Sequence, residues 1–262
     1  MSTELRRKKL MAMLSQRETI STAAVAREFG VHPMTIRRDL AALQGSGAVI
    51  RGYGSALASQ RITFEFDFDE RHRCNLAAKQ AIGQAAAARV RPGQTVFLDT
   101  GTTTLEVANA LAGLSVPCCV VTTSLMIASR LWAHPSVELL LLGGRVRPRS
   151  PDLVGPLTEM TLDSLSADLA LLGSEGVDVE RGSFAGDLDS ARVARRMAQN
   201  STRVIIVADG AKIGHSGRAR YALMADIDEI ITDSSCPELC VRAIRKQDVA
   251  VTQVQAVAAD SQ

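Results

Sequence analysis

Six short apolar runs, separated by helix-like stretches, constrain the fold of this chain more than any other feature. They are four to six residues long and are rich in valine, leucine and isoleucine without polar alternation. Such runs are typical of strands buried on both faces. The sequence therefore predicts an α/β domain with a mostly parallel sheet covered by helices on both sides. The runs span residues 95–98, 118–122, 137–142, 169–173, 204–208 and 229–232.

The helical stretches around these runs complete the predicted domain. An alanine-rich helix is expected over about 70–90, and further helices over 103–111, 124–132, 188–198 and 237–247. Residues 59–69 are polar and irregular, which indicates a linker. We therefore predict a head over residues 1–58, a linker over 59–69 and a body over 70–255.

The head has the pattern of three short helices followed by a two-stranded wing. Ser21 is a plausible N-cap of the second helix, and Gly30 ends it. Pro33 suits the first turn of the third helix. Residues 49–51 and 55–57 are expected to form the wing strands, with Gly52 and Gly54 at the turn between them.

Charge divides unevenly between the two parts. Residues 1–58 hold nine Lys and Arg against four Asp and Glu, a net charge of +5, whereas the rest of the chain carries −3. A basic head on a mildly acidic body favours a polyanion as the partner of the head.

The third helix supplies a face suited to duplex DNA. At about 100° per residue, Ile36, Leu40 and Leu43 form its buried seam, and the opposite side points outward. An α-helix with such a slim, basic outer face fits the major groove, where arginine pairs with guanine edges. A helix pair of this kind also occurs in domains that contact only proteins, so that alternative stays open. The expected DNA-binding residues are Arg6, Arg7, Met34, Thr35, Arg37, Arg38 and Arg51.

Residues 5–57 resemble the DeoR-type winged helix–turn–helix. Its usual signature is a V-S-x-x-T-I-R-R-D-L run followed by L-x-x-x-G and an R-x-H-G-G-A wing, and this chain has VHPMTIRRDL and then LQGSGAVIRGYGSA. His32, Tyr53 and Ser55 depart from that signature. The resemblance implies a transcriptional regulator that binds double-stranded operator DNA.

The strongest motif of the body is LDTGTTTLEVA, residues 98–108. It predicts a strand that ends in Asp99, a glycine–threonine turn and a helix whose first N–H groups can hold an anion. A local alternative is a capping box formed by Thr103 and Glu106, which needs no ligand. Neither a Walker A nor a GxGxxG pattern occurs, so nucleotide-binding readings are weak.

Other polar turns also follow predicted strands, and the carboxyl ends of parallel strands share one edge of a sheet. Carboxylates there can hold sugar hydroxyls, and Lys or Arg can hold phosphate. The expected effector-binding residues are Asp99, Gly101, Thr102, Thr103, Thr104, Thr123, Ser124, Gly143, Gly144, Arg145, Asp209 and Lys212.

The body from about 71 to 233 resembles the DeoR sensor domain, a fold similar to ribose-5-phosphate isomerase. The matching pieces include D-x-G-T-T at 99–103, Gly143–Gly144, Asp168, Asp209 and Lys212. Thr123, Ser190 and Gly210 are departures. The resemblance implies a phosphorylated sugar or polyol as effector, and a homodimer or homotetramer.

The remaining features limit the classes of function that we expect. The first residues are charged and lack the apolar stretch of a signal peptide, no apolar run is long enough to span a membrane, and the five cysteines favour reduced thiols in the cytoplasm. We expect no metal, no cofactor and no catalytic residues. The prediction is a repressor of a carbohydrate-catabolism operon. The alternative is a sugar-phosphate isomerase-like enzyme with Asp99, Asp209 and Lys212 as acid–base groups.

Overall fold

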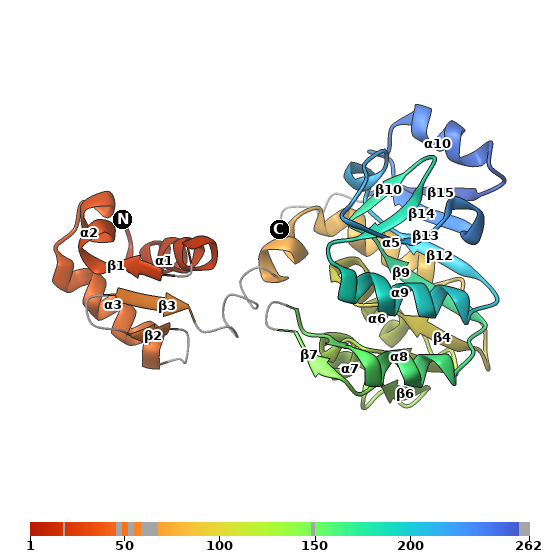
Figure 1. Ribbon diagram of the computed structural model, residues 1–262, viewed down its shortest axis with the longest axis horizontal. Coiled ribbons are helices and arrows are strands. Elements are labelled where there is room, and N and C mark those ends of the chain that lie inside the picture. The colour runs from red at the N-terminus through yellow and green to blue at the C-terminus, as the bar shows by residue number, and fades with distance from the viewer. Residues whose placement is uncertain (18, 46–48, 52–54, 59–67, 148–149, 257–262) are drawn as a thin grey trace. The chain divides into compact units, whose positions relative to one another are not determined.

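The computed structural model describes residues 1–17, 19–45, 49–51, 55–58, 68–147 and 150–256. They divide into two compact units, one containing Met1–Arg73 and the other Cys74–Arg147 with Pro151–Gln262 (Figure 1). The predicted boundaries at 58 and 70 stay predictions, because residues 59–67 lie outside the description.

The head is a winged helix–turn–helix, as expected. It contains α1 (Thr3–Arg17), β1 (Thr19–Ser21), α2 (Thr22–Phe29), α3 (Pro33–Gly45), β2 (Val49–Arg51) and β3 (Ser55–Ala58). The strands pair antiparallel in the order β1-β3-β2, so the predicted wing is present and gains a third strand. Its core is formed by apolar side chains from all three helices and β1: Leu10, Met11, Leu14, Ile20, Val25, Ala26, Ile36 and Leu40.

The body is built on a seven-stranded parallel sheet with the order β15-β14-β12-β9-β4-β5-β6 (Figure 1). All six predicted strands are present, and β15 is an additional edge strand. The strands are β4 (Thr95–Leu98), β5 (Cys118–Thr122), β6 (Val137–Leu141), β9 (Leu169–Gly173), β12 (Val204–Val207), β14 (Glu229–Asp233) and β15 (Ala250–Val254).

Helices cover both faces of this sheet, with α9 on one face and α5 and α6 on the other (Figure 1). Successive strand residues point to opposite faces, so Phe97, Leu172 and Ile206 pack with the buried side of α9, including Met197. The helices are α5 (Leu76–Ala87), α6 (Thr102–Gly113), α7 (Leu125–Leu131), α8 (Pro156–Asp163), α9 (Leu188–Gln199) and α10 (Glu238–Arg245), with short 3₁₀ turns at Gly210–Lys212 and Met224–Asp226.

Two small antiparallel sheets accompany the large one. β10 (Gly176–Asp178), β11 (Gly182–Ala185) and β13 (Ala219–Ala222) form one, and β7 (Arg145–Val146) pairs with β8 (Leu153–Val154) in the other. The sequence patterns did not predict these short strands or α8, because segments this short carry little periodicity.

The helix expected over about 70–90 is wrong in one respect. Residues 68–73 are helical, but the chain then turns at Cys74 and Asn75 before α5 begins. Asn75 has φ 53°, in the left-handed region, which interrupts a helix. Alanine content predicts helix formation on both sides of this residue and does not reveal the break.

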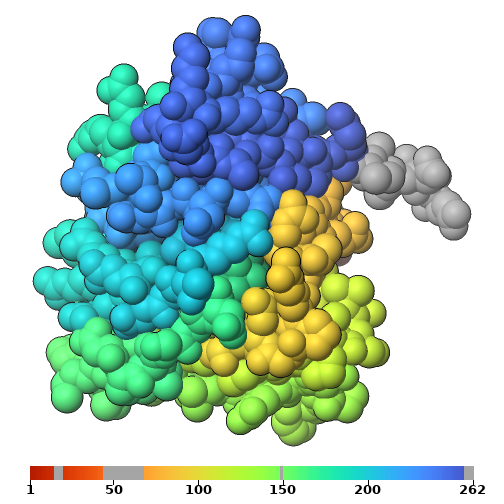
Figure 2. Space-filling model, turned by 90° about the vertical axis from the view of Figure 1, so that its right-hand side faces the viewer, coloured from red at the N-terminus to blue at the C-terminus, as the bar shows by residue number. Residues whose placement is uncertain are grey.

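Close packing of α5 on α6 positions the helix that begins at the predicted effector turn. A Cβ at Gly83 would lie 2.6 Å from the backbone carbonyl carbon of Glu106, so glycine allows the two backbones to approach. Figure 2 shows the segment containing α5 (yellow) along one face of the body, beside the C-terminal elements (blue), and α5 also contacts β14 and β15.

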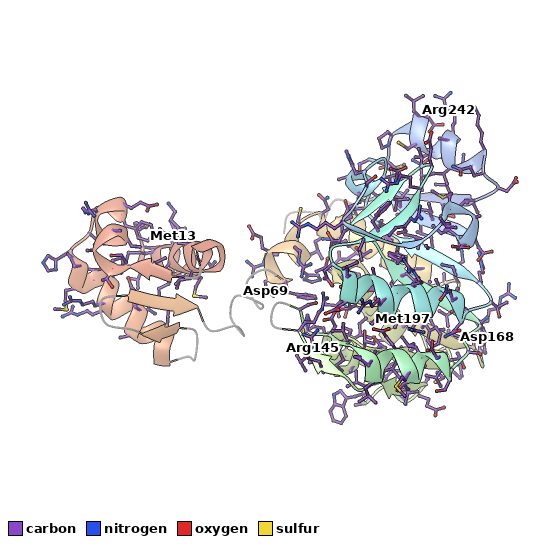
Figure 3. The ribbon with its side chains drawn as sticks, viewed as in Figure 1. Met13, Asp69, Arg145, Asp168, Met197 and Arg242 are labelled. Atoms are coloured by element: carbon purple, nitrogen blue, oxygen red, sulfur yellow. The ribbon has the colours of Figure 1, made fainter. Side chains whose placement is uncertain are left out.

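The two ends of the sheet are well separated. Arg145, which follows β6, and Asp168, which precedes β9, lie on opposite sides of the body (Figure 3). The Asp168 carboxylate accepts a hydrogen bond from the N–H of Thr95 at the amino end of β4. Asp168, one of the residues of the family resemblance, therefore stabilises the amino end of β4, which lies away from the predicted effector turns.

Candidate functional site

The turn between α2 and α3 orients the exposed helix of the head. Gly30 ends α2 in the left-handed conformation, with φ 64°. His32 then takes the capping role: its Nδ1 accepts the Met34 N–H at 3.2 Å, and its carbonyl accepts the Thr35 N–H at 2.8 Å. An imidazole thus does here what a serine hydroxyl does in the usual signature.

α3 has one buried and one exposed side. Ile36 and Leu40 are almost completely buried, whereas Met34, Arg37 and Arg38 are exposed. Thr35 is half-buried between the two sides. The periodicity predicted this division correctly, and it leaves two guanidinium groups near the start of the helix.

Arg6 and Arg7 both bind the same carboxylate, but they differ in exposure. Arg6 is 8% exposed, and its Nε donates to Asp39 Oδ2 at 2.5 Å. Arg7 Nε donates to the other oxygen, Oδ1, at 3.1 Å, and the Arg7 side chain is 41% exposed. The buried carboxylate of Asp39 therefore ties α1 to α3, and Arg6 is placed as a structural residue.

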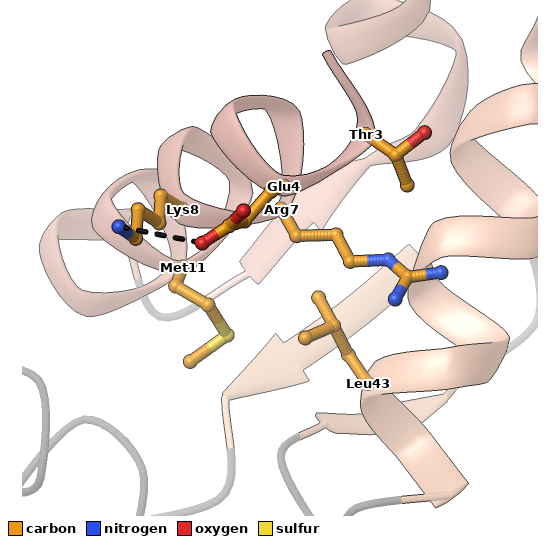
Figure 4. A pocket seen from close by; sticks show the side chains of 6 residues that line it. All are labelled: Thr3, Glu4, Arg7, Lys8, Met11 and Leu43. Atoms are coloured by element: carbon orange, nitrogen blue, oxygen red, sulfur yellow. Dashed lines mark ion pairs between the residues drawn. The ribbon is translucent and has the colours of Figure 1, made fainter.

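A shallow hollow between α1 and α3 is lined by Thr3, Glu4, Arg7, Lys8, Met11 and Leu43 (Figure 4). The Arg7 side chain extends across it toward α3, while Lys8 pairs with Glu4 on α1 at 3.8 Å. Arg51 lies in β2, and its side chain is outside the described part of the chain.

The body has its topological switch point between β4 and β9. From β4 the chain continues to β5 and β6 on one side, and from β9 to β12, β14 and β15 on the other. Ligands of open α/β sheets bind beyond the carboxyl ends of the strands at such a point. Asp99 follows β4 and Gly173 ends β9, and the Gly173 N–H donates to Asp99 Oδ2 at 3.2 Å.

The pKa of the Asp99 carboxyl group lies well above its ordinary value. Burial raises its pKa to about 7, and the nearby Asp152 carboxylate adds to that rise. The N–H groups of Thr100 and Gly173 and the guanidinium of Arg147 act in the opposite direction. Perturbed groups of this kind gather at functional sites.

The first turn of α6 lies directly after Asp99. Gly101 is the N-cap, with φ 146° and no side-chain cap, and Thr102, Thr103 and Thr104 are buried. The capping box considered for Thr103 and Glu106 is therefore not formed. Within the described residues, the buried Thr100 Oγ1 has no hydrogen-bond partner. The turn thus offers helix N–H groups and a hydroxyl to an anion.

The hydroxyl groups of Thr122 and Ser124, in the loop after β5, accept hydrogen bonds from nearby backbone N–H groups. Thr122 Oγ1 accepts the Ser124 N–H at 3.1 Å, and Ser124 Oγ caps α7 by accepting the Ile127 N–H at 3.3 Å. Thr123 is buried, and its carbonyl accepts the Leu153 N–H. This loop adjoins Asp99, because β5 pairs with β4.

Two arginines after β6 have different environments. Arg145 is exposed and donates to Asp189 at 2.7 Å. Arg147 is largely buried and holds both oxygens of Asp152, at 2.6 and 2.5 Å, and also donates to Asp187. Arg147 is thus the arginine that acts on Asp99, whereas the sequence pattern singled out Arg145.

Two close contacts constrain the turn at Gly143–Gly144, which lies between β6 and β7. Gly143 accepts a hydrogen bond from Thr158 Oγ1 at 2.7 Å. A Cβ at Gly144 would lie 2.2 Å from that oxygen, so the turn requires glycine there.

Asp209 and Lys212 follow β12. Asp209 is buried, and its Oδ1 accepts from Asn75 Nδ2 at 3.4 Å. Lys212 Nζ donates to the Ser174 carbonyl at 2.9 Å and lies 4.0 Å from Glu175. Lys212 therefore joins the loop after β12 to the end of β9 beside Asp99.

The sequence patterns did not predict a chain of hydrogen-bonded hydroxyl groups at the end of β9. Tyr221 donates to the Gly173 carbonyl at 2.6 Å, and Ser183 lies 2.8 Å from both the Tyr221 and Ser174 hydroxyls. Burial raises the pKa of Tyr221. Isolated serines and tyrosines in sequence give no sign that β9, β11 and β13 bring them together.

Other site types receive no support within the described ranges. No group of three or more histidine, cysteine or carboxylate side chains there is placed to hold a metal ion. No described helix has the length and apolar character needed to cross a bilayer. A separate cleft beside α9, lined partly by Arg195, Arg220 and Asp228, lies near the amino end of β12, away from Asp99.

Two family models match the chain. Residues 6–61 match the DeoR-like helix-turn-helix domain, and residues 74–234 match the DeoR C terminal sensor domain. The second match alone covers more than half of the chain.

Curated relatives match over nearly their whole length. A protein of Escherichia coli O157:H7 named for transcriptional repression of the aga operon is 33% identical, with 96% of this chain and 94% of that protein covered. The HTH-type transcriptional regulator GlpR of Haloferax volcanii is 32% identical, over 88% and 89%. The glycerol-3-phosphate regulon repressor of Escherichia coli K12 is 28% identical, over 87% and 90%.

Among solved structures, a ribose 5-phosphate isomerase A from Methanocaldococcus jannaschii is 16% identical, with a TM-score of 0.40 over 53% of this chain and 55% of that one. The two matched domains and the full-length relatives agree with the winged head and the parallel-sheet body described above. This chain belongs to the DeoR family of transcriptional regulators, with a DeoR-like helix–turn–helix followed by a DeoR sensor domain.

Proposed function

We propose that this protein is a cytoplasmic, sequence-specific repressor of a carbohydrate-catabolism operon, released from its operator by a phosphorylated sugar or polyol. One observation carries the proposal: Arg37 and Arg38 are exposed on a helix whose other side is locked into the core of the head. Two charges on a rigid helix can enter a major groove without further rearrangement.

In the proposed complex the first turns of α3 contact DNA. Arg38 pairs with a base edge, and Thr35 and Arg37 contact phosphates on either side, with Met34 between them. The exposed part of Arg7 adds positive charge, and Arg51 in the wing follows the backbone. Arg6 has no place in this surface, because its guanidinium is buried against Asp39.

In the proposed effector complex the ligand lies at the switch point. Its phosphate accepts hydrogen bonds from the first N–H groups of α6, where Gly101 leaves no side-chain cap. Asp99 and Asp209 accept hydrogen bonds from sugar hydroxyls, and Lys212 adds a positive charge. The name of one relative refers to the glycerol-3-phosphate regulon, which supports this class of ligand.

Release of DNA requires that the effector prefers the state with low DNA affinity. We propose a homodimer or homotetramer in which two heads occupy successive major grooves of an operator with repeated half-sites. A change in the spacing of the heads then weakens binding.

We also propose that the body is a sensor and not an isomerase. The Lys212 amine donates to a backbone carbonyl, and Asp99 is held by two N–H groups, so both are restrained as binding groups. Aldose–ketose interconversion of phosphorylated pentoses and hexoses, measured with purified protein, is expected to stay at the rate without protein. Turnover would favour the enzyme.

The proposal is tested by fluorescence anisotropy on a duplex that the protein selects from a random pool. A panel of ribose 5-phosphate, glucose 6-phosphate, fructose 6-phosphate and glycerol 3-phosphate is then titrated into the complex. We expect at least one compound to release the wild type and Lys246→Ala, an exposed-lysine control, but to release Lys212→Ala poorly. No enrichment of any duplex at low salt would overturn DNA binding, and no release by any compound would overturn the effector class.

A further inference from the structure

The boundary between the two compact units coincides with a backbone of unusual conformation. The first unit ends its main stretch at Arg73, and the second begins at Cys74. Asn75 follows with φ 53°, between the helical residues 68–73 and α5. Left-handed backbone at a non-glycine residue persists only where its surroundings hold it, and asparagine tolerates it better than most residues.

Two side-chain contacts help to hold this turn. Lys79, which is 3% exposed, donates from Nζ to the Cys74 carbonyl at 2.5 Å. The Asn75 side chain donates from Nδ2 to Asp209 Oδ1 at 3.4 Å. The Asn75–Asp209 contact bridges 134 positions in the chain, from the N-cap of α5 to the loop after β12.

Asp209 is anchored on its own side. The Ala208 N–H donates to Ile231 on the neighbouring strand, and the Gly210 N–H donates to Asp233 Oδ1. Asp209 is 4% exposed, and its Oδ1 is already bonded to the Asn75 amide. A ligand hydroxyl that binds Oδ1 therefore competes with the Asn75 amide for that buried oxygen.

We propose that Asn75 is the positioning residue through which the effector site acts on the segment leading to the head. A sugar hydroxyl bound to Asp209 Oδ1 displaces the Asn75 amide, and the turn at Cys74–Asn75, which follows residues 68–73, then loses one of the side-chain bonds that hold it. This inference rests on the proposed function, because it takes Asp209 as part of the effector site.

Reciprocity gives the proposal measurable consequences. If the Asn75–Asp209 bond exists only in the DNA-competent state, removing it shifts the conformational equilibrium away from that state, so DNA binding weakens and effector binding strengthens. A coupling of this kind changes each affinity by roughly fivefold or more.

The test uses the full chain with Asn75→Gly, because glycine adopts the left-handed backbone without strain and lacks the side-chain amide. Asp248→Gly is the matched control: within the described residues Asp248 is the other non-glycine residue with positive φ, at 62°. We expect Asn75→Gly to bind the selected duplex about fivefold to tenfold more weakly without any sugar phosphate, and to bind the releasing compound of the panel correspondingly more tightly. Asp248→Gly is expected to match the wild type in both.

A second variant, Asn75→Asp, places a carboxylate against Asp209 and is expected to give a larger loss of DNA affinity than Asn75→Gly. Circular dichroism and thermal unfolding check that both variants fold. Equal affinities of Asn75→Gly and Asp248→Gly for duplex and ligand would overturn the role of Asn75, while release of the wild type would leave the proposed function standing.

Weaker DNA binding with unchanged ligand affinity would also overturn the coupling, because it would show a structural effect only. A wild type that no compound releases would overturn the effector class, and the coupling with it.

Discussion

Two helices begin at the proposed binding surfaces, and their first turns differ in accessibility. At the start of α3, Met34, Arg37 and Arg38 are exposed, whereas at the start of α6 the side chains of Thr102–Thr104 are buried. An exposed, charged turn can meet a large partner from outside, and a buried turn of hydroxyls admits only a small one. The burial of the first turn, more than its residue types, thus distinguishes the proposed DNA-binding helix from the proposed effector-binding helix.

The same comparison applies to charge. In the head, Asp39 neutralises Arg6 inside the fold and leaves Arg37 and Arg38 free to face outward. In the body, Arg147 is held by Asp152 and Asp187, beside Asp99. Buried charges should therefore control stability, and exposed charges should control binding.

The largest expected effect concerns the buried carboxylate of the head. Asp39→Ala leaves the Arg6 guanidinium buried without its partner, which should lower the free energy of unfolding of the head by roughly 3–5 kcal/mol. Hydrogen exchange of the α3 amides would measure it, with Glu28→Ala, an exposed carboxylate of α2, as control. Equal protection in both variants would contradict a stabilising role for the pair.

A second effect of similar size is expected at Asp99. Its folded pKa of about 7 lies above the ordinary value of 3.8, so the wild type loses stability as pH rises from about 4 to about 7. Between pH 4 and pH 8, Asp99→Asn should gain about 4 kcal/mol relative to the wild type, because the amide never ionises.

Denaturant unfolding at the two pH values would measure that gain. Asp168→Asn, at an exposed carboxylate on the other side of the sheet, should show no such gain. If the difference between Asp99→Asn and the wild type is the same at both pH values, Asp99 does not titrate as described.

A smaller effect is expected for the exposed arginine that we assign to a base. Arg38→Ala should cost roughly 1–3 kcal/mol of operator affinity and relax the base preference at one position. Anisotropy with the selected duplex and its single-base variants measures both, and Arg242→Ala on α10 is the charge-matched control. A uniform loss across all duplexes would assign Arg38 to a phosphate.

The smallest effect sharpens the distinction between the two arginines. Arg37→Ala should weaken binding to all duplexes alike and reduce the slope of log affinity against log salt by about 0.9, since one phosphate contact is lost. The measurement is a salt titration of the wild type and the two variants. A change of sequence preference in Arg37→Ala would exchange the two assignments.

Much of the fold could be predicted from local pattern. The six apolar runs became six of the seven strands of the large sheet, and the helix seam with Ile36 and Leu40 is buried as expected. The missed strands of the two small sheets have two to four residues and show little periodicity. The break at Asn75 was also missed, because alanine-rich sequence favours a helix on both sides of it.

The candidate site was predicted only in outline. Asp99 and the α6 turn follow from the strand–turn–helix motif, but Arg147, Ser174 and Tyr221 did not stand out in the sequence. Their roles depend on partners such as Asp152 and Gly173, which lie on other elements. Arg6 and Arg7 share a basic run, yet Arg6 is buried and Arg7 is partly exposed, because they point in different directions from α1.

The sequence alone determined the two-part organisation, the class of each fold and the turns where ligands are expected, because hydrophobic periodicity and glycine–threonine turns act over short stretches of chain. Only the tertiary structure decided which charged side chains are neutralised inside, which arginine acts on Asp99 and that Asn75 contacts Asp209. Those properties depend on burial and on distances between segments far apart in the chain, which residue order does not contain.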